Sequence, residues 1–183
     1  MNSLQGHFLV ASPHLLDENF VKTVILLVQH TDQGAFGVVI NRPTTKTVGE
    51  LWDEVGQSQC DSRRPVYLGG PVPGPLMAVH TDRSLAEIDA LPEVFVAMKK
   101  DDLDELVRQK KHPFKVFVGH AGWSAGQLEL ELEEGAWFTA PATIETIFND
   151  RDDLWECVSR RVGESVLEAA LHLKTLPADP TMN

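Results

Sequence analysis

Short apolar runs, each followed by turn-forming residues, place the strongest constraint on the fold of this chain. The run at 24–28 is rich in β-branched residues and is too short to be a buried helix. Turn-forming residues at 31–34 separate it from a similar run at 36–40. This pattern predicts an antiparallel hairpin made of segments 21–29 and 35–41. Further strands are predicted by the same reasoning at 8–11, 66–68, 76–80, 94–98 and 114–118.

Helical patterns lie between these strands and at the end of the chain. Thr47 and Glu50 fit a capping box at the start of an amphipathic helix. Segment 101–111 has acidic residues in its first turn and basic residues in its last, as the helix dipole favours. The alternating Leu and Glu residues at 128–133 fit a strand or a helix, and we expect a helix because both are good helix formers.

The order of these elements indicates the fold class. Strands dominate the first two thirds of the 183 residues, and the C-terminal third is helical, which favours an α+β fold with a mixed, largely antiparallel sheet. With 43% hydrophobic and 23% charged residues, the chain can bury a sizeable core. We expect residues 1–175 to form a single domain and residues 176–183 to form a frayed tail.

The charge of the chain limits its partners. The 16 Lys and Arg residues against 27 Asp and Glu residues give a formal net charge of −11. Direct nucleic-acid binding is therefore not expected, because it depends on neutralising phosphates with a basic face. No apolar run reaches the ~20 residues of a membrane span, and the first residues lack a secretory pattern. These features predict a cytoplasmic protein without a membrane partner.

Cysteine and histidine residues give no sign of a disulfide framework or a metal site. Cys60 and Cys157 are too few for a disulfide scaffold, and Cys157 falls on an apolar helix stripe that predicts burial. The seven histidines are scattered without a metal-ligand spacing. The segment 69–71 lacks the Lys-Ser/Thr of a phosphate-binding loop, so we assign no metal and no cofactor.

One short motif suggests hydrolase chemistry. Residues 122–126 read G-x-S-x-G, which would make Ser124 a nucleophile. However, five residues separate the end of the predicted strand at Val118 from Ser124, whereas a nucleophile elbow follows its strand directly. The downstream histidine, His172, falls within a helical pattern rather than on a loop. The spacing therefore argues against a catalytic triad, and no catalytic residue is assigned.

Polar and glycine-rich residues gather just after the predicted strands, where a scaffold commonly holds binding groups. Each such segment can also be read as simple punctuation of a strand by Gly and Pro. If the segments converge, a guanidinium and backbone N–H groups would suit an anionic or carbonyl ligand. The candidate ligand-binding residues are Asn41, Arg42, Gly69, Gly70, His120, Trp123, Gln127 and Glu129.

The same segments carry a family resemblance. The chain reads GxFLxAxP at 6–13, GVVINRP at 37–43, GGPV at 69–72 and GHAGWxxGQLExE at 119–131. These four blocks resemble the bacterial YqgE/AlgH family. The resemblance implies an α+β domain whose strands fold into a pseudo-barrel with flanking helices. Members are often labelled as candidate transcriptional regulators, without an established reaction. His120 stands where the family pattern leads us to expect an aromatic residue.

Two functions remain open. The first is a non-enzymatic, cytoplasmic binding or regulatory protein that acts through a small-molecule or protein partner, with a link to transcription through that partner. The alternative is an enzyme whose pocket is formed by the loops 41–43, 69–71 and 119–123 and which acts on a small anionic substrate. In that case His120 or Glu129 would serve as acid or base. Both functions predict that Arg42 and the loop 119–123 lie on one face.

Overall fold

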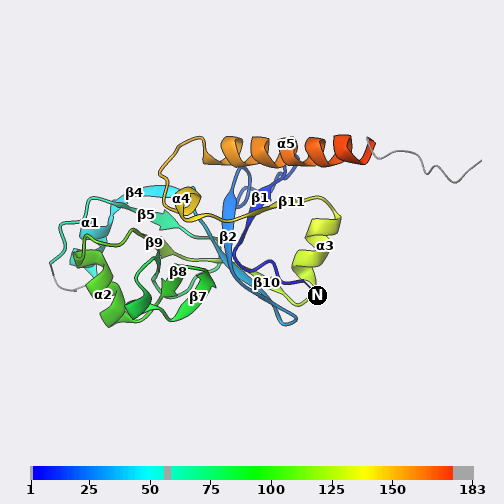
Figure 1. The fold of residues 1–183 in the computed structure, drawn as a ribbon. Helices are drawn as coiled ribbons and strands as arrows, with labels where there is room; N and C mark the ends of the chain where they lie inside the picture. Colours follow the sequence, from blue (N-terminus) through cyan, green and yellow to red (C-terminus); the bar gives the residue numbers. More distant parts are fainter. Residues whose placement is uncertain (1, 56–58, 175–183) are drawn as a thin grey trace, which may run out of the picture.

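The computed structural model describes residues 2–55 and 59–174, which form an α+β fold with two β-sheets (Figure 1). The predicted tail at 176–183 lies outside the described residues. All eleven described strands take part in antiparallel pairs. One further pair, between β5 (Pro65–Leu68) and β9 (Phe114–Val118), is parallel. The mixed, largely antiparallel arrangement predicted from the sequence is thus confirmed, and the two sheets do not close into a barrel within the described ranges.

The first sheet has five strands in the order β10-β3-β2-β1-β11, all antiparallel. The predicted hairpin is confirmed, because β2 pairs with β3 across the turn near residues 32–33. The central strand β2 is a nearly continuous apolar run that is buried on both faces. The bounds of the strands are Ala121–Ser124 for β10, Gly34–Val39 for β3, Val24–Thr31 for β2, His7–Ala11 for β1 and Trp137–Pro141 for β11.

The second sheet has six strands in the order β4-β5-β9-β6-β8-β7. Its parallel pair places the ends of β5 and β9 side by side, and the glycine-rich segments that follow both strands therefore leave the sheet together. The remaining bounds are Pro43–Thr47 for β4, Met77–His80 for β6, Val94–Ala97 for β8 and Ile88–Leu91 for β7.

Helices pack around the two sheets (Figure 1). The capping box of α1 is present, with the Thr47 and Glu50 side chains each accepting from the other residue's backbone N–H. The predicted helix at 128–133 is confirmed as α3, and in Figure 1 α5 runs along the first sheet. None of the described helices is both long and apolar enough to cross a membrane. The bounds are α1 Val48–Glu54, a 3-10 turn Arg83–Leu85, α2 Lys100–Arg108, α3 Gln127–Glu133, α4 Ile144–Ile147 and α5 Leu154–Lys174.

Some short strands do not follow from local sequence. The segment predicted as a loop after Val118 contains β10, which extends the first sheet by pairing with β3. Its Ala-Gly-Trp-Ser sequence has little strand propensity, so the unpaired edge of β3 determines its conformation. Pro43 lies beyond the end of β3 and is the first residue of β4, an edge strand in which the missing N–H of proline is tolerated. The helix predicted at 101–111 ends earlier, at Arg108.

Candidate functional site

Asn41 and Arg42, which follow β3, bind the backbone of their own chain. The Asn41 Oδ1 accepts from the Val24 backbone N–H at 2.8 Å, and its Nδ2 donates to the Lys22 carbonyl at 2.9 Å. The Arg42 guanidinium donates to three backbone carbonyls in the turn at 18–21, at 2.6 to 3.2 Å. Both side chains therefore fix the turn that leads into β2.

Gly69 and Gly70 allow two chain segments to approach closely. A Cβ at Gly69 would lie 2.3 Å from the Gly119 carbonyl oxygen, and a Cβ at Gly70 would lie 2.2 Å from the His120 carbonyl carbon. The Val72 and His120 backbones exchange two hydrogen bonds of 3.0 Å. Any side chain at these glycines would separate the two segments.

His120 packs its ring against neighbouring residues. The ring lies edge-on to Phe36, with centroids 5.4 Å apart. A Cβ at Gly74 would lie only 2.9 Å from Nδ1, which shows how closely this residue covers the imidazole. Nδ1 is buried and has no hydrogen-bond partner among the described residues.

Trp123 and Gln127 belong to a cluster centred on Glu131 of α3. The Glu131 Oε2 accepts from the indole N–H of Trp123 at 2.8 Å and from that of Trp137 at 2.7 Å. The Gln127 Nε2 donates to the other carboxylate oxygen at 3.0 Å. Phe20 packs against both indoles. The cluster joins β10, α3 and β11, and we call it the Glu131 cluster.

Glu129 lies on the same helix and pairs with a buried histidine. The His30 Nδ1 accepts from the Leu4 backbone N–H at 3.0 Å. The neutral ring therefore carries its proton on Nε2, which donates to Glu129 Oε1 at 2.8 Å. A hydrogen bond from its own backbone N–H is the main reason that the pKa of Glu129 lies below its ordinary value. The two hydrogen bonds of the His30 ring therefore connect the N-terminal segment, through β2, to α3.

The candidate nucleophiles also have structural contacts. Ser124 ends β10, and its Oγ donates to Gln127 Oε1 at 3.1 Å. The side chain of His172 lies outside the described part of the structure.

The two cysteines are separate from this motif. Cys60 and Cys157 are free and buried, which confirms the predicted burial of Cys157. Within residues 2–55 and 59–174, no group of three or more His, Cys, Asp or Glu side chains is placed to hold a metal ion.

The structure brings the predicted loops together only in part. The loops 69–71 and 119–123 are in direct backbone contact. The Arg42 carbonyl accepts from the Leu68 N–H at 2.9 Å, so this backbone also lies near the end of β5. The guanidinium of Arg42, however, is bound to the turn at 18–21. A common ligand for all of these residues stays a prediction.

A different polar cluster, formed by Tyr67, Lys115 and Asp150, has the features of a functional site. Lys115 lies within β9 with its side chain 4% exposed, and its Nζ is 3.1 Å from Asp150 Oδ1. The same Nζ donates to the Ile40 and Asn149 carbonyls at 3.4 and 3.3 Å. The Tyr67 hydroxyl donates to the same Asp150 oxygen at 2.5 Å. Asp150, in contrast, has a side chain that is 66% exposed.

Burial and mutual contacts perturb all three groups. Burial lowers the pKa of the Lys115 ammonium, although the nearby Asp150 carboxylate opposes this effect. Burial, followed by the hydrogen bond to Asp150, raises the pKa of the Tyr67 hydroxyl. Burial would raise the pKa of Asp150, but the Tyr67 hydrogen bond and the Lys115 charge together hold it below its ordinary value. Perturbed groups of this kind often mark functional sites.

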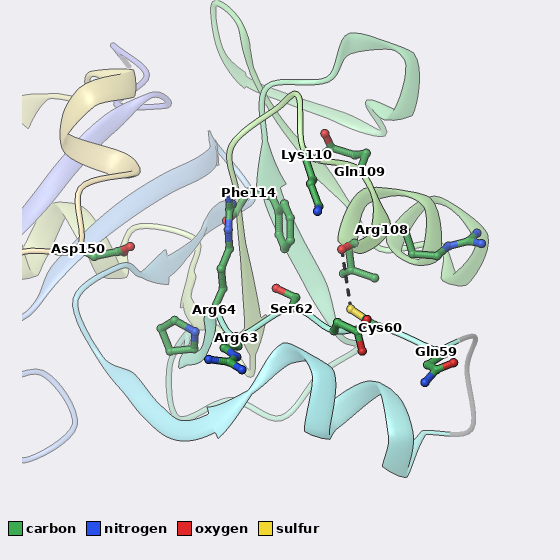
Figure 2. Close-up of a pocket in the computed structure, with 13 residues that line it drawn as sticks. Gln59, Cys60, Ser62, Arg63, Arg64, Arg108, Gln109, Lys110, Phe114 and Asp150 are labelled. Atoms are coloured by element: carbon green, nitrogen blue, oxygen red, sulfur yellow. Dashed lines mark hydrogen bonds between the residues drawn. The ribbon is translucent and has the colours of Figure 1, made fainter.

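Three cavities meet at Asp150. The largest, of about 810 Å³, is lined by residues 59–65 and 107–110 together with Phe114 and Asp150 (Figure 2). A second, of about 160 Å³, reaches Tyr67 and Lys115. A third, of about 290 Å³, extends toward Asn41 and Pro43. Pro65 and Asp150 line all three, and we call the combined depression the Asp150 cleft.

Sequence reasoning missed this cleft because its residues belong to no motif. Tyr67, Lys115 and Asp150 come from β5, β9 and the segment before α5, and the rest of the lining comes from other segments, including residues 59–65 and 107–110; only the fold brings them together. One signal was available: Lys115 interrupts the apolar run Phe114–Val118. A lysine inside a strand that is otherwise buried needs a polar partner elsewhere in the fold.

The described residues form an α+β fold with a ligand-sized depression. Residues 8–167 match the family model described as AlgH-like, and the chain therefore belongs to this family. It is 38% identical to a UPF0301 protein of Thermobifida fusca, over 99% of this chain and 96% of the relative. It is 36% identical to the UPF0301 protein CT0663 of Chlorobaculum tepidum, over 86% of each chain.

Two solved structures share the fold. The solution structure of the AlgH protein from Pseudomonas aeruginosa has a TM-score of 0.70 and 30% sequence identity, over 97% of this chain and 96% of that one. The crystal structure of protein DIP2367 from Corynebacterium diphtheriae has a TM-score of 0.67 and 27% identity, over 88% and 87% of the two chains. The family resemblance and the fold class expected from the sequence are both confirmed.

Proposed function

We propose that this chain is a cytoplasmic, non-enzymatic binding protein that acts through a small molecule bound in the Asp150 cleft, or through a protein partner that this binding controls. The observation that carries the proposal is the cavity of about 810 Å³ beside the Tyr67–Lys115–Asp150 cluster. Its volume lies within the range of about 300–1,000 Å³ that is typical of small-molecule sites.

Binding without catalysis is favoured by the way in which Lys115 is held. An ammonium group has three hydrogens, and Lys115 Nζ has three oxygen acceptors within 3.4 Å. With its donors used, this amine presents no lone pair to a substrate as nucleophile or base. The cluster supplies a fixed ion pair in the wall of the cleft rather than a reactive group.

In this proposal, the link to transcription passes through the partner. The net charge of −11 opposes the approach of a nucleic-acid backbone at long range. A small ligand experiences instead the local potential of the cleft, because salt screens charges beyond about 10 Å. We therefore propose a small molecule as the direct ligand, and a protein as the partner that its binding controls.

Thermal-shift screening against a panel of metabolites tests this proposal, because a ligand that binds the native state raises the melting temperature. We expect at least one compound to stabilise the wild type. Ser62→Trp, which places an indole in the wall of the largest cavity (Figure 2), should abolish the shift. Ser165→Trp places an indole in a separate cavity beside α5 and gives the control, because the shift should survive it. Stabilisation that survives Ser62→Trp, or no stabilisation by any compound, would refute the site.

A further inference from the structure

The charges in the largest cavity are unlike those of the chain as a whole. The chain carries a net charge of −11, yet basic side chains outnumber acidic ones around this cavity. A cavity with walls of one charge raises the local concentration of ligands of the opposite charge. The charged residues in the lining are Arg63, Arg64, Arg108 and Lys110, with Asp61 and Asp150.

Two of these charges are already neutralised within the protein. The Arg108 Nη2 lies 2.9 Å from Asp104 Oδ2, and Figure 2 shows its guanidinium directed away from the other lining side chains. Asp150 is paired with Lys115 at 3.1 Å. This leaves three basic residues against Asp61.

The three remaining basic side chains are available to a ligand. Arg63 and Lys110 have no hydrogen bond or ion pair to another residue in the part of the chain that the structure describes. In Figure 2 the Lys110 ammonium is directed toward the interior of the cavity. All three basic side chains belong to exposed residues, so a bound anion would replace water around them.

Arg64 is positioned more precisely than the other two. Its Nη1 donates to the Phe114 carbonyl at 3.1 Å, and its Cζ lies 4.5 Å from the centre of the Phe114 ring. The Phe114 ring and carbonyl thus fix the guanidinium. Arg64 lines both the largest cavity and the second one. A guanidinium that is fixed in this way can grip an oxyanion with two parallel N–H donors at a smaller entropic cost.

We propose that this cavity binds a small organic oxyanion, with the phosphate or carboxylate group held by Arg64 and flanked by Arg63 and Lys110. This inference rests on the proposed function and names its ligand class. A volume of about 810 Å³ is far larger than a single phosphate ion needs, so the anionic group belongs to a larger organic molecule. On its other side, Arg64 lines the second cavity together with the Asp150–Lys115 pair, whose two charges already balance each other.

Isothermal titration with four probe sets tests the ligand class: inorganic phosphate, sugar and nucleoside monophosphates, di- and tricarboxylates, and the uncharged sugars and nucleosides. We expect an organic phosphate or a carboxylate to bind, and its uncharged counterpart to bind at least tenfold more weakly. The comparison of the second and third sets distinguishes the two sources of the oxyanion. Affinity should fall as the salt concentration rises.

Matched variants locate the site. Arg64→Ala and Lys110→Ala should each weaken binding about tenfold, whereas Arg108→Ala should change it less than twofold because Arg108 is paired with Asp104. Arg64→Lys, which keeps the charge but loses the two-donor geometry, should recover only part of the affinity. A cooperative melting transition, measured for each variant, is the control that the variant is folded.

Each contrary result has a distinct meaning. Equal loss of affinity in Arg108→Ala and Arg64→Ala would overturn the assignment of these residues. Binding of an uncharged compound in the cleft, with no anion bound, would overturn the oxyanion class and leave the proposed binding function standing. A cleft that binds no compound of the four sets would overturn the oxyanion class, and the proposed binding function would fall with it only if the metabolite panel also gave no stabilisation.

Discussion

Removal of the Glu131 carboxylate is the sharpest test of how the fold is held together. One oxygen of Glu131 accepts from the indole N–H groups of Trp123 and Trp137, whose residues are 6% and 4% exposed. Glu131→Ala leaves both donors without this acceptor, and water can reach them only in part. The variant should therefore lose more stability than a typical change at a helix surface.

The magnitude follows from the two hydrogen bonds. A bond to a charged group contributes about 1.5–3 kcal/mol, and partial access of water at this half-buried carboxylate lowers the sum. We expect Glu131→Ala to cost roughly 2–4 kcal/mol of the free energy of unfolding. For a chain of this size, that corresponds to a fall in Tm of roughly 5–15 °C. Glu131→Gln keeps an acceptor oxygen and should cost about 1–2 kcal/mol.

Urea unfolding followed by tryptophan fluorescence and circular dichroism measures these effects, because two of the four tryptophans lie in the cluster. Glu133→Ala is the matched control, since Glu133 is an exposed glutamate on the same helix and should stay within about 0.5 kcal/mol of the wild type. If Glu131→Ala were as stable as Glu133→Ala, the Glu131 cluster would not be what holds α3 to the first sheet.

Three further predictions concern the glycines and the Asp150 cleft. Gly69→Ala should cost at least ~2 kcal/mol of unfolding free energy because its Cβ would meet the Gly119 carbonyl, whereas Gly163→Ala on α5, with open space around it, should gain about 0.5–1 kcal/mol. The pKa of Asp150 is lower in the folded protein than its ordinary value of 3.8, so this group contributes stability that is present above pH 3.8 and lost as the pH falls through the folded pKa. The free energy of unfolding, measured at pH 5 and at pH 3, should therefore fall less in Asp150→Asn than in the wild type. An equal fall in both proteins would contradict this prediction. Lys115→Met should stay within about 1 kcal/mol of the wild type in urea unfolding, because Asp150 remains hydrated, and a loss above ~3 kcal/mol would show that the ion pair is needed for folding.

The parts of the fold that depend on local sequence could be predicted. The hairpin of β2 and β3 has its apolar runs and its turn within one short segment, and the capping box of α1 needs only Thr47 and Glu50. The short strands β10 and β11 could not be predicted, because distant partners determine them. In β11, for example, Pro141 lies opposite His7.

The candidate site was harder to predict for a physical reason. Glycine, proline and asparagine after strands mark positions where the backbone turns or approaches another segment, and the same residues also occur in binding loops. Here Gly69 allows the approach of Gly119, and Asn41 satisfies the backbone at the start of β2. The Asp150 cleft depends on residues far apart in the chain, and of these only Lys115 had an unusual sequence context.

The buried polar groups of this protein differ in whether the fold explains their presence. Asn41 and Glu131 accept from N–H groups that would otherwise be unpaired, so the fold itself accounts for them. Lys115 differs, because burying its ammonium carries a desolvation cost that an apolar side chain in β9 would avoid. Its partner Asp150 is exposed in a cavity, so water can solvate the carboxylate and no counter-charge is needed to stabilise it. Stability therefore gives no reason for a lysine at this position, whereas positioning of the Asp150 carboxylate in the wall of a ligand site does.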